Sequence, residues 1–214
     1  MKARPAPCTA QQLAGTLAVM NYLAHIYLAQ HDDEAMVGAL LGDFVGSDKL
    51  DHYSATLQAE IRLHRKIDRY TDSHPAVLAA RQYFPDGRRR YAGILLDVYY
   101  DHLLARYWSR YSDTPLDQFN QRFYAALQAR QDQWPERLAE IAPHMMAHDW
   151  LGAYRQRESV DQAIRRIATR LSRNGDRLVD CLSDLQSHEA ALAQGFDVFF
   201  PELISYVQAE RRGR

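Results

Sequence analysis

Apolar residues recur three and four positions apart along most of this chain, which is the period of an α-helix. Alternating runs bounded by turn residues, the pattern of strands, are missing. The pattern predicts helices over 20–30, 34–46, 57–72, 75–84, 89–111, 115–131, 160–172 and 176–194, short helices separated by Pro135 and Pro143, and a last helix that starts or kinks at Pro201. The predicted fold is an all-α, single-domain multi-helix bundle.

The segment LQAEIRLHRKIDRYTD (57–72) is the centre of this pattern. At about 3.6 residues per turn, one stripe carries Leu57, Ile61, His64 and Asp68. The basic side chains cluster on roughly the opposite face: Arg62, Arg65, Lys66 and Arg69. Burying an ionised carboxylate is costly unless a cation, hydrogen bonds or a metal compensates it. The inward pair His64 and Asp68 therefore needs a partner from elsewhere in the chain.

Three other predicted helices carry polar groups on apolar stripes. These groups are His25 in the first helix, Asp43 in the second, and Asp97 and Asp101 in the long helix, with His102 beside them. Asp97 and Asp101 are like charges four residues apart, so a cation is the simplest remedy for their repulsion. Imidazoles and carboxylates together match the ligands of Mg²⁺, Mn²⁺ or Fe²⁺, and the imidazoles favour Mn²⁺ or another transition metal.

Each group also has a simpler interpretation. His25 can be a hydrogen-bonded core histidine, Asp43 can be exposed at a frayed helix end, and His64 with Asp68 can form a private pair. The dipeptide His148-Asp149 is interpreted as a solvated or capping pair, because neighbouring residues on a helix point about 100° apart. Gly38 and Gly42, four residues apart, predict that the second helix packs closely on a neighbour.

Composition adds little about partners. Hydrophobic residues make up 47% and charged residues 25%, as in soluble globular proteins, and the net charge is −1. No apolar run approaches the ~20 residues of a membrane span, and no nucleic-acid-binding motif is evident, so we expect neither partner. Cys8 and Cys181 form no metal or disulfide pattern, which favours a cytoplasmic location.

The first nineteen residues differ from the rest of the chain. Pro5, Pro7, Gln11 and Gln12 interrupt the apolar region that a signal peptide would need. We therefore expect 1–19 to be a non-functional N-terminal extension and 20–214 to form the folded domain.

Four blocks, MNYLAHIYLA, LLGDFV, HRKIDRYTDSHP and LDVYYDHLLARYW, resemble in this order and spacing the acyl-carrier-protein phosphodiesterase family. The resemblance implies a helical fold distantly similar to HD-type metal-dependent phosphohydrolases. It also implies hydrolysis of holo-acyl carrier protein to 4′-phosphopantetheine and apo-protein, with Mn²⁺ or Mg²⁺ as cofactor. The matched positions are His25, Asp43, His64, Asp68, Asp72, Asp97, Asp101 and His102.

From the resemblance and the stripes together we expect a site and its roles. The expected metal ligands are His25, Asp43, His64, Asp68, Asp97 and Asp101. The expected catalytic residues are Asp68, Asp72 and His102, with a carboxylate accepting a proton from water and His102 or His64 protonating the leaving alkoxide. Two basic groups, Arg62, Arg65, Lys66 and Arg69 with Arg88, Arg89 and Arg90, are expected to dock the acidic carrier protein.

Two alternatives remain open from the sequence. One is an HD-type phosphohydrolase of a nucleotide or another small phosphoester. The other is a non-catalytic helical adaptor whose inward polar groups form a buried hydrogen-bond network.

Overall fold

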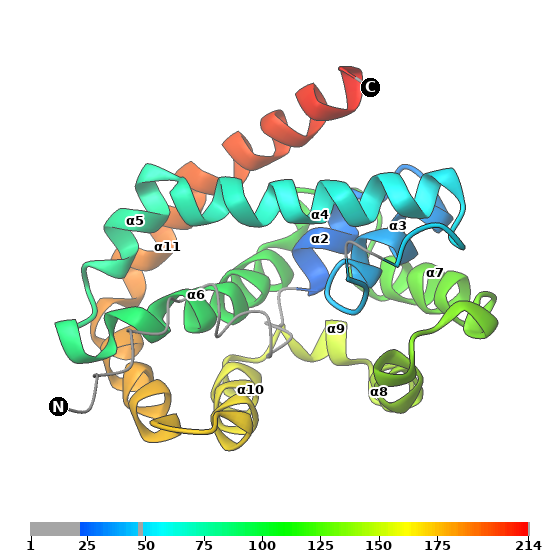
Figure 1. Ribbon diagram of the computed structural model, residues 1–214. Helices are drawn as coiled ribbons and strands as arrows, with labels where there is room; N and C mark the ends of the chain where they lie inside the picture. The colour runs from blue at the N-terminus through cyan, green and yellow to red at the C-terminus, as the bar shows by residue number, and fades with distance from the viewer. Residues whose placement is uncertain (1–21, 47–48, 214) are drawn as a thin grey trace, which may run out of the picture.

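The computed structural model describes residues 22–46 and 49–213, and the predicted extension 1–19 lies outside this part. The described residues form ten α-helices and two short 3-10 helices, without a strand among them (Figure 1). The predicted single all-α domain is confirmed. None of the described helices has both the length and the apolar character needed to span a bilayer.

The helices follow the order α2 (Tyr22–Leu28), α3 (Asp33–Leu41), α4 (Ala55–Ser73), α5 (Pro75–Arg81), α6 (Asp86–Arg106), η1 (Trp108–Arg110), α7 (Leu116–Gln128), η2 (Gln131–Gln133), α8 (Glu136–Ala147), α9 (Trp150–Ala153), α10 (Arg157–Arg170) and α11 (Gly175–Arg212). The predicted start at Pro75 is confirmed, and two other helices start at a side-chain cap. The Asp32 side chain caps α3 by accepting from Ala35 N, Ser54 caps α4 by accepting from Leu57 N, and Pro75 is the first residue of α5.

The predicted break at Pro143 and the predicted helix start at Pro201 are both wrong. Helix α8 continues through Pro143, and α11 continues through Pro201. Proline removes one backbone donor, but an apolar face buried on both sides of it holds the helix together. In α11 this face includes Phe196 before Pro201 and Leu203 after it. The backbone of α11 departs from helical angles only at His188, with φ −123° and ψ 16°.

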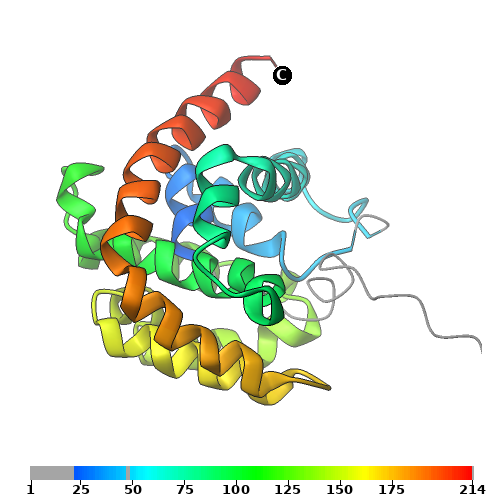
Figure 2. The same ribbon diagram turned by 90° about the vertical axis from the view of Figure 1, so that its left-hand side faces the viewer.

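Helix α11 connects the two sides of the bundle. It packs against α4, α5, α6 and α10, and Figure 2 shows it as a long bent rod along the molecule. Helix α4 lies across the top of Figure 1, with α2 and α3 beneath it. The apolar interior of the bundle includes fully buried Ile26, Leu40, Ile61 and Tyr99.

Helices α3 and α4 pack closely on each other, as the two glycines predicted. A Cβ built on Gly38 would lie 2.8 Å from the Cβ of Glu60 and 3.2 Å from the Cα of Leu57. A Cβ on Gly42 would lie 2.2 Å from Cγ of His64. Only glycine at these two positions lets the α3 backbone approach α4 this closely.

We predict that Gly38→Ala destabilises the protein by about 1–3 kcal/mol, because the added methyl group overlaps the backbone and the side chains of α4. Urea denaturation measures the change. Gly195→Ala in α11 is the matched control, because its Cβ would meet only Ala76 O, at 3.9 Å. Replacing a helical glycine in open space stabilises by up to about 1 kcal/mol. Equal effects of the two substitutions would contradict close packing at Gly38.

Candidate metal centre

His64 on α4 is fixed by a backbone carbonyl of α3. The ring is 3% exposed, and Nδ1 donates a hydrogen bond to Ala39 O at 2.7 Å. Since a carbonyl oxygen only accepts, Nδ1 carries the proton and the neutral ring presents a lone pair at Nε2. A histidine that binds a metal through one ring nitrogen usually donates the N–H of the other to a carbonyl or carboxylate in this way.

His25 on α2 lies against His64. The two rings stack with centroids 3.7 Å apart and an interplanar angle of 14°. His25 is 1% exposed, and its Nε2 lies 3.1 Å from Oδ1 of Asp68. Neither of its ring nitrogens makes a hydrogen bond of normal geometry with another described residue. A hydrogen-bonded core histidine would have such a partner, so this simpler interpretation of His25 is not favoured.

Two carboxylates face the histidines. Asp68 lies with Oδ2 3.4 Å from Nε2 of His64, and Oδ1 of Asp43 lies 3.7 Å from the same nitrogen. The stripe predicted that Asp68 points inward, but its side chain is 45% exposed. Asp68 therefore forms the outer edge of the cluster, where a ligand from solvent reaches it, whereas Asp43 is 14% exposed.

Burial and mutual charge shift the pKa values of these groups. Burial, followed by the neighbouring His25, lowers the pKa of His64, so a proton on Nε2 is disfavoured. Burial raises the pKa of Asp43 to about 7, and Asp68 adds to this effect. Burial alone would raise the pKa of Asp68 too, but His64 and His25 outweigh it and the pKa is lowered. Asp68 is therefore an anion at neutral pH, facing the lone pair of His64.

A divalent cation fits this set of donors. Ligand atoms of His25, His64 and Asp68 lie within 4.8 Å of one another. Asp43 sits next to the three, and its Oδ2 is buried without a hydrogen bond to another described residue. Two imidazole nitrogens and carboxylate oxygens are ligands for Mn²⁺, Fe²⁺ or Zn²⁺. The absence of a side chain at Gly42 gives the His64 ring its space.

Asp101, expected as a metal ligand, contacts the backbone of α2. Its Oδ2 accepts from Leu23 N and its Oδ1 from Ala24 N, both at 2.9 Å. The carboxylate thus satisfies backbone donors in the first turn of α2, the helix that carries His25. Burial outweighs these two bonds and raises the pKa of Asp101 well above its usual range.

Asp97 and Asp72 lie beside the cluster on α6 and α4. Asp97 lines a small cavity together with His25 and Tyr100. Burial and the charges of Asp68 and Asp72 raise the pKa of Asp97 well above its usual range. Exposed Asp72 accepts from Arg81 Nη2 at 2.5 Å. No sequence pattern pointed to Arg81, because this partner lies on the next helix.

His102 is not among the residues that the structure gathers at the cluster. Its ring is 1% exposed, and Nδ1 donates to the carbonyl of Tyr154 at 2.7 Å. This contact joins α6 to the end of α9. The pair His148-Asp149 is confirmed in a capping role, because the Asp149 side chain caps α9 by accepting from Gly152 N.

The basic residues expected to dock a partner differ in their surroundings. Arg62 and Arg69 are exposed on α4. Lys66 pairs with Glu210 at 2.6 Å, and Arg65 donates to Val45 O at 2.7 Å. At the start of α6 the three arginines contact their own chain, in the pairs Arg88 with Asp184, Arg89 with Asp86 and Arg90 with Tyr91.

Fold and site together define an all-α protein whose His/Asp cluster is suited to a divalent cation. Residues 20–203 match the family described as acyl carrier protein phosphodiesterase. Proteins named acyl carrier protein phosphodiesterase from Salmonella agona, Salmonella dublin and Salmonella newport are each 36% identical over 194 residues, covering 90% of this chain and 99% of theirs. This chain belongs to the acyl carrier protein phosphodiesterase family. No solved structure shows significant similarity to it, so the expected likeness to HD domains stays a prediction.

We predict that Asp43→Asn removes a pH-dependent loss of folding stability from the metal-free protein. The Asp43 carboxyl titrates near 3.8 when unperturbed and at about 7 in the fold. Between these values the folded chain holds a proton that the unfolded chain has released, so stability falls as pH rises. This group contributes a loss of about 1.4 kcal/mol per pH unit.

The stability of Asp43→Asn relative to wild type should therefore rise from about pH 5 to about pH 7 and stay level above this. Urea denaturation in the presence of a chelator measures it. Asp132→Asn, at an exposed position of η2, should show no such trend. A flat difference for Asp43→Asn would contradict a buried carboxylate at this position.

Proposed function

We propose that this chain hydrolyses the phosphodiester bond between 4′-phosphopantetheine and the serine of holo-acyl carrier protein, giving apo-protein. The observation that carries the proposal is the cluster of His25, His64 and Asp68. A phosphodiesterase needs positive charge near a phosphoryl oxygen and a way to activate water. Membership in the family supplies the substrate class.

In this proposal His25, His64 and Asp68 hold a divalent cation, with Asp43 as a further ligand. Mn²⁺ and Mg²⁺ are the candidates, and two imidazoles favour Mn²⁺. When bound, the cation supplies Lewis acidity that lowers the pKa of a water and neutralises charge on a phosphoryl oxygen. The Nδ1 bond from His64 to Ala39 keeps Nε2 free to bind it.

Proton transfer falls to Asp97 in this proposal. Asp97 lines a small cavity together with His25, and burial raises its pKa, so its carboxylate takes up a proton more readily than that of an ordinary aspartate. Asp97 accepts the proton of the attacking water at its carboxylate oxygen. The same carboxyl then returns the proton to Oγ of the carrier serine as the phosphodiester bond breaks. Asp68 positions the cation, Asp72 is held by Arg81 at the edge of the site, and His102 supports α9.

The carrier protein is proposed to dock on the exposed side of α4. Asp68 reaches the surface there, and Arg62 and Arg69 are exposed on the same helix. Acidic carrier helices would meet these two arginines while the prosthetic arm enters at Asp68. Lys66 and Arg88 are engaged in ion pairs within the chain and contribute less.

The test is mass spectrometry of holo-acyl carrier protein incubated with the enzyme and Mn²⁺. We expect the carrier to lose the mass of phosphopantetheine. Asp68→Asn should lower the rate by at least about 100-fold and lower the bound Mn²⁺, because loss of an outer-shell partner alone costs ~10–100-fold. Asp132→Asn should behave as wild type. Release of phosphate from nucleotides with the carrier unchanged would instead identify a small-molecule phosphohydrolase.

We predict that the double variant Arg62→Glu and Arg69→Glu raises KM for holo-carrier by roughly tenfold at low salt and leaves kcat unchanged. The effect should fade at high salt, because exposed charges are screened. Steady-state kinetics over a salt series measures it. Arg173→Glu, in the exposed connection between α10 and α11, is the control. An equal rise in KM for the control would contradict docking on α4.

A further inference from the structure

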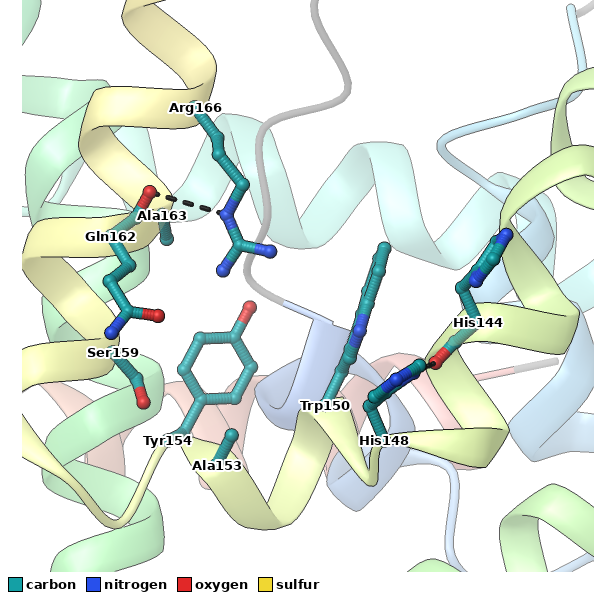
Figure 3. A pocket seen from close by; sticks show the side chains of 9 residues that line it. All are labelled: His144, His148, Trp150, Ala153, Tyr154, Ser159, Gln162, Ala163 and Arg166. Carbon is teal, nitrogen blue, oxygen red and sulfur yellow. Dashed lines mark hydrogen bonds between the residues drawn. The ribbon is translucent and has the colours of Figure 1, made fainter.

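A second pocket lies between α8, α9 and α10, and the metal cluster contributes no residue to it. Its volume is about 410 Å³, within the range of small-molecule sites. Figure 3 shows the side chains around it, which include His144, His148, Trp150, Tyr154, Gln162 and Arg166. The proposed reaction uses none of these side chains.

The lining favours an anion. Arg166, His144 and His148 are the groups able to carry charge, and no carboxylate from the described part of the chain lines the pocket. Arg166 Nε donates to Gln162 O at 3.3 Å, which directs the rest of the guanidinium toward the opening above Tyr154 (Figure 3). A guanidinium presented in this way matches the two oxygens of a phosphate group.

One wall of the pocket is the indole ring of Trp150, which faces Tyr154 across the opening (Figure 3). Trp150 follows Asp149, whose φ of 40° is left-handed and strained for a residue with a side chain. The Oδ1 atom of Asp149 accepts from Asn120 at 3.0 Å, from Tyr124 at 3.0 Å and from Gly152 N at 3.1 Å. These three bonds hold the strained turn that places His148 and Trp150 at the pocket.

Tyr154 forms the floor of the pocket, and a residue of α6 fixes its position. Tyr154 is 3% exposed, and its carbonyl accepts from Nδ1 of His102 at 2.7 Å. Two separate networks, from α7 and from α6, thus fix the pocket in advance of any ligand. Pre-organisation of this kind is typical of binding sites.

We propose that this pocket binds a small phosphate monoester with a planar group. The phosphate pairs with Arg166, and the planar group lies against the face of Trp150 that is turned toward Tyr154 (Figure 3). Two sources share this chemistry: 4′-phosphopantetheine, which has planar amides, and an adenine nucleotide, which has an aromatic base. The choice of 4′-phosphopantetheine rests on the proposed function, whereas the phosphate site itself does not, because no residue of the His/Asp cluster lines the pocket.

The test is calorimetric titration of the full chain, in the presence of a chelator, with AMP and with 4′-phosphopantetheine. Adenosine and pantetheine are the phosphate-free counterparts. We expect at least one phosphate ester to bind at one site per chain, about tenfold or more tighter than its counterpart. The tighter of the two esters identifies the source.

Variants locate the site. Arg166→Gln should weaken binding by about tenfold or more, whereas the matched control Arg165→Gln should bind as wild type. Both positions are exposed on α10, so neither substitution removes core packing, but Arg165 does not line the pocket. Asp68→Asn at the metal cluster should also bind as wild type. Failure of both esters to bind, equal affinity in the two arginine variants, or loss of binding in Asp68→Asn would each overturn the proposal.

Discussion

The close approach of α3 to α4 is the constraint on which the site depends. Glycine at positions 38 and 42 lets the backbone of α3 lie against α4, and the Ala39 carbonyl then reaches Nδ1 of His64. This single hydrogen bond selects the tautomer and aims the lone pair of Nε2 toward Asp43 and Asp68. A larger residue at position 42 would displace the ring and move Nε2 away from the two carboxylates.

Helical periodicity was enough to predict the class of fold and most helix starts. Ser54 and Asp32 cap their helices because their side chains accept hydrogen bonds from nearby backbone N–H groups. Caps of this kind depend only on neighbouring residues, so they can be predicted from the sequence. The continuity of α8 and α11 through proline was not predictable, because it depends on apolar faces buried against other helices. At those two positions tertiary packing outweighs the tendency of proline to end a helix.

The candidate site, too, could be predicted only in part. A stripe shows which side of its own helix a residue occupies, and this sufficed to group His25, His64, Asp68 and Asp43. The stripe does not show which residues of other helices face it. Asp101 meets backbone donors 78 and 77 residues away, and His102 meets a carbonyl 52 residues away, so no pattern near either residue predicts these roles.

The position of α11 has a consequence for synthesis of the protein. This helix packs against α4, α5, α6 and α10, yet all four are translated before it. Until α11 emerges from the ribosome, the apolar surfaces that it covers stay open to water or to chaperones. The helices that carry the His/Asp cluster therefore complete their packing late, and the nascent chain is most prone to aggregation just before α11 is released.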